Sequence, residues 1–131
     1  MIKTVNFLKE AGIFFISTIN GDKPEVRPFG AINIYNDRLY FITSNTKDVY
    51  KQMVKNPNIQ ISAVKNNGSW IRLRGQVVFD ESYDAKKSML DNNPNLRMMY
   101  NESDNKMVVF YLANAKATIE SFTSPKEEEL F

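Results

Sequence analysis

The chain has 131 residues, a formal net charge of +2, no cysteine and no histidine. That length suits one domain with its own core, and the missing residue types exclude zinc fingers, iron–sulfur clusters, disulfides, thiol catalysis and Ser-His-Asp triads. The carboxylates show no spacing for a metal site, so redox or acid–base chemistry here would depend on an organic cofactor.

The charge is unevenly distributed along the chain. We expect residues 1–124 to form one domain and residues 125–131, PKEEELF, to be a disordered acidic tail. Without that tail the net charge is about +4, and its dispersed lysines suit a small anionic ligand rather than a nucleic acid. The apolar run at the N-terminus is too short for a signal peptide, and no stretch could span a membrane. We therefore expect a cytoplasmic protein without a membrane partner.

Hydrophobic periodicity predicts three helices and a series of short strands. Residues 2–11 have helical spacing and end at Gly12, which is typical of a helix C-cap. A second helix begins at about Lys47 and ends before Pro57, and a third covers residues 82–90 with Asp80 or Ser82 as its N-cap. Pro94 begins a further short helical piece. The predicted strands cover residues 13–19, 26–35, 39–43, 59–64, 70–79, 107–112 and 117–122, the last two being one strand or a pair.

The order of these elements predicts a mainly β fold. Tight turns at 20–22, 36–37 and 66–68 join successive strands, so the strands pair antiparallel. About six such strands leave fewer exposed edges when the sheet closes. We therefore predict a small antiparallel β-barrel with helices on its outside, and no dinucleotide-binding or P-loop motif is present.

Three stretches carry candidate binding residues. Ser44 and neighbouring hydroxyl residues precede a helix whose first turn carries Lys47 and Lys51. This arrangement could bind a phosphate, or it could be an ordinary capped helix with a solvated lysine face. Arg27 lies in a strand beside Pro28 and Gly30, either as a ligand group near an open backbone or as a surface residue at a bulge.

Trp70, Arg72 and Arg74 alternate along one strand and therefore share a face. That face could stack on a ring, line a subunit interface or be an ordinary barrel exterior. A dimeric barrel that binds an anionic ligand or single-stranded nucleic acid there is one reading of this pattern, and it predicts binding with a steep salt dependence.

Taken in order, several segments resemble the FMN-binding split-barrel family related to pyridoxamine 5′-phosphate oxidase. The resemblance covers residues 3–123, and its segments are PEVRPF at 24–29, LYFITS at 39–44, the lysines and Asn-Pro-Asn-Ile of 47–59, WIRLRG at 70–75 and FYLANAKA at 110–117. No single one of these motifs is specific to the family, but their occurrence together in this order is. The resemblance implies a split barrel that forms a homodimer, with one FMN in each of two clefts between the subunits.

Carried over to this sequence, the resemblance assigns eleven cofactor-binding residues. Arg27 would reach the phosphate or ribityl chain, the backbone of residues 28–31 would follow the ring edge, and Trp70 would approach from the partner subunit. The full set is Arg27, Pro28, Phe29, Gly30, Ala31, Ile42, Thr43, Ser44, Lys47, Lys51 and Trp70. No catalytic acid or base can be named from the sequence.

The chain departs from the authentic oxidase at its C-terminus. It ends in TSPKEEELF and has no counterpart of the Arg- and Trp-bearing segment that helps bind pyridoxal. It is more similar to short relatives that include nitroimidazole-resistance-type proteins. The resemblance thus implies an FMN-dependent oxidoreductase that moves hydride or electrons from NADH or NADPH to a small acceptor. A non-catalytic flavin-binding module is the alternative, as is a module for the deazaflavin F420, while the missing histidine argues against haem.

Overall fold

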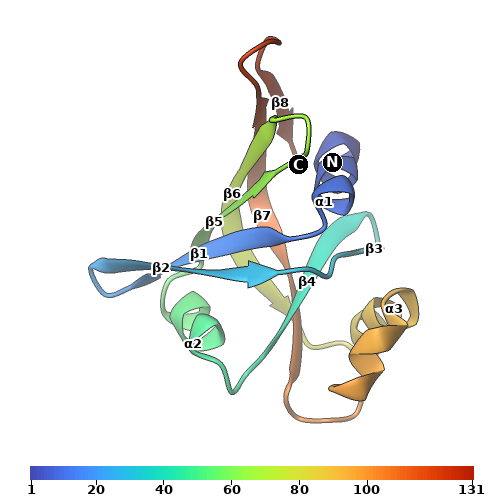
Figure 1. The fold of residues 1–131 in the computed structure, drawn as a ribbon. Helices are drawn as coiled ribbons and strands as arrows, with labels where there is room; N and C mark the ends of the chain where they lie inside the picture. The colour runs from blue at the N-terminus through green and yellow to red at the C-terminus, as the bar shows by residue number, and fades with distance from the viewer.

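The computed structural model describes residues 1–131, which form three α-helices, one 3₁₀ helix and eight strands (Figure 1). The helices are α1 (Ile2–Ala11), α2 (Asp48–Lys55), α3 (Tyr83–Asn92) and η1 (Pro94–Met98). The strands are β1 (Phe14–Asn20), β2 (Lys23–Phe29), β3 (Asn33–Tyr35), β4 (Arg38–Ser44), β5 (Asn58–Val64), β6 (Trp70–Asp80), β7 (Met107–Glu120) and β8 (Glu127–Leu130). No helix has both the length and the apolar character needed to cross a membrane.

All strand pairs are antiparallel, in the order β2-β1-β5-β6-β7-β4-β3, with β8 added beside β7. Laid flat, that path of seven strands would be about 29 Å wide. Yet its two edge strands, β2 and β3, are joined only by residues 30–32, which can span at most about 15 Å. The sheet must therefore curl until its edges approach each other, which confirms the predicted barrel with flanking helices.

The predicted strand over residues 26–35 is wrong in its extent. β2 ends at Phe29, where its pairing with β1 stops opposite Phe14, and β3 begins at Asn33 and pairs with β4 instead. Residues 30–32 leave one edge of the sheet and join the other, so no single ladder could hold the whole segment. Periodicity could not reveal this change of partner, because the apolar pattern continues through it.

Two apolar clusters fill the space on either side of β4. Alternate residues Leu39 and Phe41 join the larger cluster inside the curled sheet, which also takes in Val5, Phe7 and Leu8 of α1. Tyr40 and Ile42 point the other way into a smaller cluster under α3. β4 is thus buried on both faces, which explains why the Leu39–Thr43 stretch reads as almost continuously apolar.

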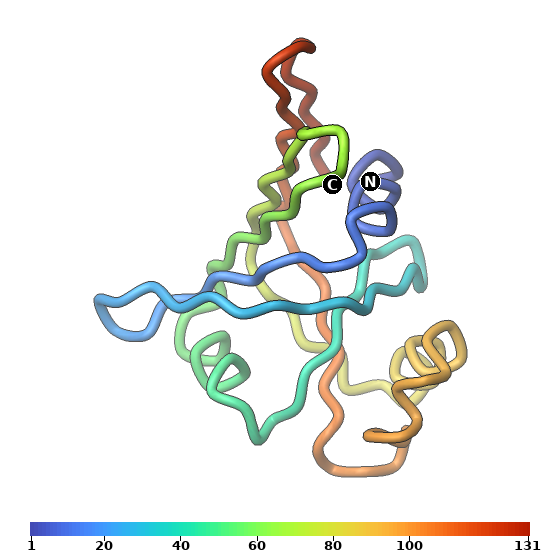
Figure 2. Tube along the Cα trace, in the orientation of Figure 1, coloured from blue at the N-terminus to red at the C-terminus, as the bar shows by residue number.

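The expectation of a disordered acidic tail is wrong. β8 pairs with β7 over Lys116–Ile119, and Phe131 exchanges two backbone hydrogen bonds with Ala115. Glu129 accepts hydrogen bonds from the backbone of Lys3 and Thr4 at the start of α1. Figure 2 shows the two chain ends side by side. The three glutamates suggested disorder, but one of them caps a helix that starts more than 120 residues earlier in the chain.

Candidate functional site

A cleft with a volume of about 370 Å³ lies where the end of β2, the middle of β4, the start of α2 and the η1 segment meet. Apolar side chains and two cations line it together. Its lining residues are Arg27, Pro28, Phe29, Gly30, Ala31, Ile42, Lys47, Val49, Asn93, Asn95, Leu96, Met99 and Tyr100. The volume falls within the roughly 300–1,000 Å³ that small-molecule sites occupy.

The predicted site residues of β2 and the following loop all lie in this cleft. Arg27, Pro28, Phe29, Gly30 and Ala31 form one continuous wall of it. This part of the chain can turn away from the sheet because β2 is an edge strand, where Pro28 removes no ladder hydrogen bond. Ile42 and Lys47 reach the same cleft from β4 and from the N-cap position of α2.

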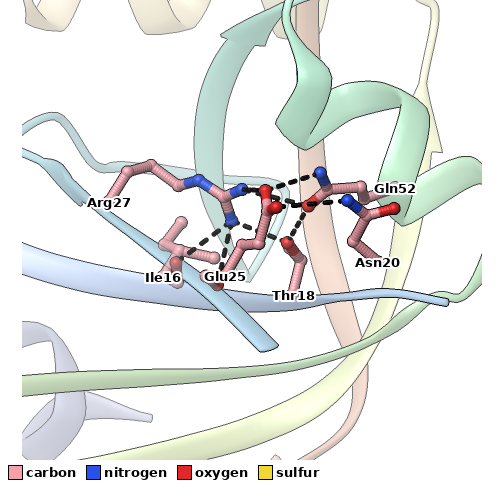
Figure 3. A network of polar contacts seen from close by, with 6 residues as sticks. All are labelled: Ile16, Thr18, Asn20, Glu25, Arg27 and Gln52. Carbon is pink, nitrogen blue, oxygen red and sulfur yellow. Dashed lines mark hydrogen bonds and ion pairs between the residues drawn. The ribbon is translucent and has the colours of Figure 1, made fainter. Parts of the chain in front are cut away.

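The Arg27 guanidinium is held in place by partners on β1, β2 and α2 (Figure 3). Its Nη1 donates to Thr18 Oγ1 at 2.6 Å, and its Nη2 donates to Gln52 Oε1 at 3.0 Å. Glu25 Oε2 lies 3.6 Å from Nη2 as an ion pair. Burial lowers the pKa of Arg27, and the charges of Glu25 and Asp48 oppose that shift. The guanidinium therefore remains charged and is oriented before any ligand arrives, and Arg27 is one of the residues that line the cleft.

The two lysines predicted to hold a phosphate lie in different hollows. Lys47 lines the cleft, whereas Lys51 lines a separate hollow beside the β1–β2 turn, together with Asp48 and Lys55. No side chain caps the N-terminus of α2, so its first-turn N–H groups add a favourable field for an anion near Lys47. The structure brings Lys47, and not Lys51, to Arg27's cleft.

Thr43 and Ser44 follow Ile42 on β4 without lining the cleft themselves. Thr43 is 2% exposed, and its Oγ1 is a buried side-chain atom without a hydrogen-bond partner. Ser44 Oγ lies 2.8 Å from Thr46 Oγ1 and accepts from the Thr46 backbone N–H at 3.3 Å. Ser44 therefore shapes the turn into α2, while Thr43 carries an unused hydroxyl.

Trp70 lies away from the cleft of its own chain. Its Nε1 donates to Glu120 Oε2 at 3.0 Å, and its ring packs on Phe122 with centroids 5.1 Å apart. Arg72 pairs with the same Glu120 oxygen at 3.0 Å. The shared face expected for Trp70 and Arg72 is therefore present, and its nearest partners belong to β7 and the segment after it.

Sequence reasoning missed the wall that the η1 segment contributes to the cleft. Asn93, Asn95, Leu96, Met99 and Tyr100 come from this segment, and burial raises the pKa of Tyr100. Pro94 correctly signals a helical turn, but nothing local shows that this turn lies against β2 and β4. The available signal for this wall in the sequence was a stretch that is rich in Asn and Met and carries no charge at its start.

Comparisons with known proteins identify the family and related structures. A family model described as pyridoxamine 5′-phosphate oxidase matches residues 2–91. A NimC/NimA family protein from Clostridium acetobutylicum is 40% identical, with all of this chain and 92% of that chain covered and a TM-score of 0.98. No curated protein sequence matches.

More distant solved structures share the fold. A pyridoxamine 5′-phosphate oxidase-related, FMN binding protein from Nostoc punctiforme has a TM-score of 0.66 at 13% identity, covering 99% of this chain and 94% of that chain. A heme binding protein from Mycobacterium smegmatis has a TM-score of 0.74 at 10% identity, covering 92% and 53%. The family model and the 40% identical relative confirm the resemblance stated from the sequence: the chain belongs to the pyridoxamine 5′-phosphate oxidase-related split-barrel family.

Proposed function

We propose that this protein binds FMN in the cleft between β2, β4, α2 and η1 and uses it to pass hydride from NADH or NADPH to a small acceptor. The observation that carries the proposal is one cleft that combines an apolar wall with Arg27 and Lys47. A flat apolar ring with an anionic phosphate needs both kinds of surface. The FMN binding protein from Nostoc punctiforme shows that a member of this fold can carry the cofactor.

The residues of the cleft fit each part of FMN. Phe29, Ile42 and Leu96 offer apolar contact to the ring, and Gly30 lets a planar group approach the backbone. Arg27 and Lys47 would hold the phosphate, with charge-assisted bonds that contribute roughly 1.5–3 kcal/mol each. Two charged bonds and the buried ring could together reach micromolar affinity, about −8 kcal/mol.

FMN, when bound, supplies the hydride chemistry, and the chain's role is to bind, orient and shield it. Arg27 is oriented by Thr18 and Gln52, so little ordering of that side chain opposes binding. The chain has no His or Cys, so proton movements would involve water, the ligand or hydroxyl and backbone groups. Leu96 and Met99 contribute apolar side chains to one side of the cleft.

We further propose that two copies form a homodimer in the cytoplasm and that Trp70 of the second copy completes the site. In its own chain Trp70 lies on the outer sheet face, away from the cleft, which is where a residue that serves the other subunit should lie. A non-catalytic flavin-binding module is the alternative reading. Oxidation of NADH or NADPH by the FMN-loaded protein separates the two.

The decisive experiment is a fluorescence titration of FMN against wild type, Lys47→Ala and Lys51→Ala. The two lysines are one helical turn apart and chemically identical, but only Lys47 lines the cleft. Lys47→Ala should weaken FMN binding about tenfold, consistent with one lost charge-assisted bond, and Lys51→Ala less than twofold. A wild-type protein that takes up no FMN, or equal losses in both variants, would overturn the assignment.

A further inference from the structure

A second hollow, the amide recess, adjoins the cleft. Its volume is about 500 Å³, and it shares Gly30 and Asn93 with the cleft. Ile34, 38% exposed, and the partly exposed Ile32 contribute apolar surface, and Asn33 and Asn92 add amide groups. Lys9 lines the recess and does not line the cleft. The two hollows therefore meet at Gly30 and Asn93 but differ in their charged group.

The hydrogen bonds of Asn93 decide which of its side-chain atoms a ligand can use. Its Nδ2 donates to Ile32 O at 3.0 Å and to Met89 O at 3.1 Å, so both amide hydrogens have backbone acceptors. Because two carbonyl oxygens cannot donate, the amide cannot be reversed without losing both bonds. Asn93 Oδ1 is therefore fixed as the free atom, an acceptor at the junction of cleft and recess.

Lys9 provides the complementary group. It lies in the last turn of α1, is exposed and takes part in no ion pair. A ligand that fits the amide recess thus needs an N–H donor for Asn93, a ring to contact the apolar surface and an anionic group for Lys9. A carboxamide-bearing aromatic ring with a phosphate tail has all three features.

We propose that the amide recess binds the nicotinamide nucleotide part of the hydride donor, with its carboxamide N–H on Asn93 Oδ1 and its phosphate on Lys9. This assignment rests on the proposed function, because it places the donor's ring beside the flavin cleft at Gly30. The carboxamide should be selected over a carboxylate, since a carboxylate would set a negative oxygen against the Asn93 acceptor. The phosphate contact should weaken as ionic strength rises.

The test is calorimetric titration of the FMN-loaded protein with nicotinamide mononucleotide, nicotinic acid mononucleotide and nicotinamide riboside. Lys9→Ala should weaken binding of nicotinamide mononucleotide about tenfold and leave the phosphate-free riboside unchanged. Lys55→Ala is the matched control, because Lys55 occupies the last turn of α2 as Lys9 does that of α1, and it should change neither. The carboxylate analogue should bind at least tenfold more weakly than the carboxamide, a comparison that needs no substitution at Asn93.

The outcomes separate this inference from the proposed function. FMN uptake without nucleotide binding, or with equal affinity in Lys9→Ala and wild type, overturns the amide recess and leaves the flavin site standing. Nucleotide binding that depends on Lys9 in a protein that takes up no FMN supports the recess and overturns the flavin proposal. FMN affinity itself should not change in Lys9→Ala, because Lys9 does not line the cleft.

Discussion

Arg27 Nη2 donates a 3.0 Å hydrogen bond to Gln52 Oε1 and so joins strand β2 to helix α2. The same amide donates from Nε2 to Glu25 Oε2 at 2.9 Å and accepts from Thr18 Oγ1 at 2.5 Å. Gln52 is 8% exposed. One neutral, buried amide thus bonds both a cation and an anion, and it fixes the arginine that lines the cleft.

Replacing Gln52 by Leu should lower the free energy of unfolding by about 2–3 kcal/mol, because Arg27 and the buried Thr18 hydroxyl each lose their acceptor. FMN affinity should fall several-fold as Arg27 becomes mobile. Urea denaturation and FMN titration measure the two effects. Gln60→Leu, on the exposed face of β5, is the control and should change stability by about 0.5 kcal/mol or less. Equal stability losses would show that the network does not hold the arginine.

Thr43 and Thr18, two of the three buried threonines, should respond oppositely to substitution by Val. Thr43 Oγ1 has no partner, so Thr43→Val should leave the ligand-free protein as stable or up to about 1 kcal/mol more stable, and FMN affinity should stay unchanged because Thr43 does not line the cleft. Thr18 Oγ1 bonds Arg27 and Gln52, so Thr18→Val should cost about 1–3 kcal/mol. Thermal unfolding with and without FMN tests both. Loss of stability in ligand-free Thr43→Val would contradict the finding that this buried hydroxyl has no hydrogen-bond partner.

Gly75 lies where the β6–β7 register shifts, opposite the bend at Asn114, whose φ is 53°. A Cβ at position 75 would lie 2.9 Å from Ala113 O, a backbone atom that cannot rotate away. Gly75→Ala should therefore destabilise the protein by about 1–3 kcal/mol. Gly30→Ala is the matched control, since its Cβ would lie 3.5 Å from Ile13 Cδ1 in ordinary contact. Thermal melts should show a large decrease only for the first variant; similar melting temperatures would disprove the close approach.

Glu129 makes the folding stability of the protein depend on pH in the acidic range. Burial raises the pKa of Glu129, but hydrogen bonds from Thr4, the terminal amine and Lys3 outweigh it and lower the pKa from 4.5 to about 2. A depressed carboxylate pKa contributes stability above the unfolded value, and that contribution is lost as pH falls from 4.5 towards 2. The contribution is on the order of 2–3 kcal/mol.

Glu129→Gln should remove this contribution near neutral pH and flatten the stability profile between pH 4.5 and 2. Glu127→Gln serves as the control, because Glu127 is exposed and pairs with Lys3 only at 3.7 Å. Chemical denaturation at several pH values gives both profiles. Parallel profiles for wild type and Glu129→Gln would show that the carboxylate does not stabilise the start of α1.

Local sequence was enough for most elements and for the family. Residues 2–11 form the predicted helix and end at Gly12, and Ser82 is the N-cap of α3, accepting from Ala85 N. These features depend on spacing and capping within a few residues, which the sequence states directly. The predicted wall of residues 27–31 also lies in one cleft, because consecutive residues cannot be separated.

Tertiary structure decided the features that depend on contacts between distant segments. The sequence determined the element types, the lack of His and Cys chemistry and the motif set of the split-barrel family. The curl of the sheet brings residues 27, 47 and 96 together and places the two termini side by side. It therefore decides which lysine faces the cleft, where the η1 wall lies and that Glu129 caps α1. Periodicity records which face of an element is apolar, but not which distant element covers it, and the curl of the sheet makes that choice.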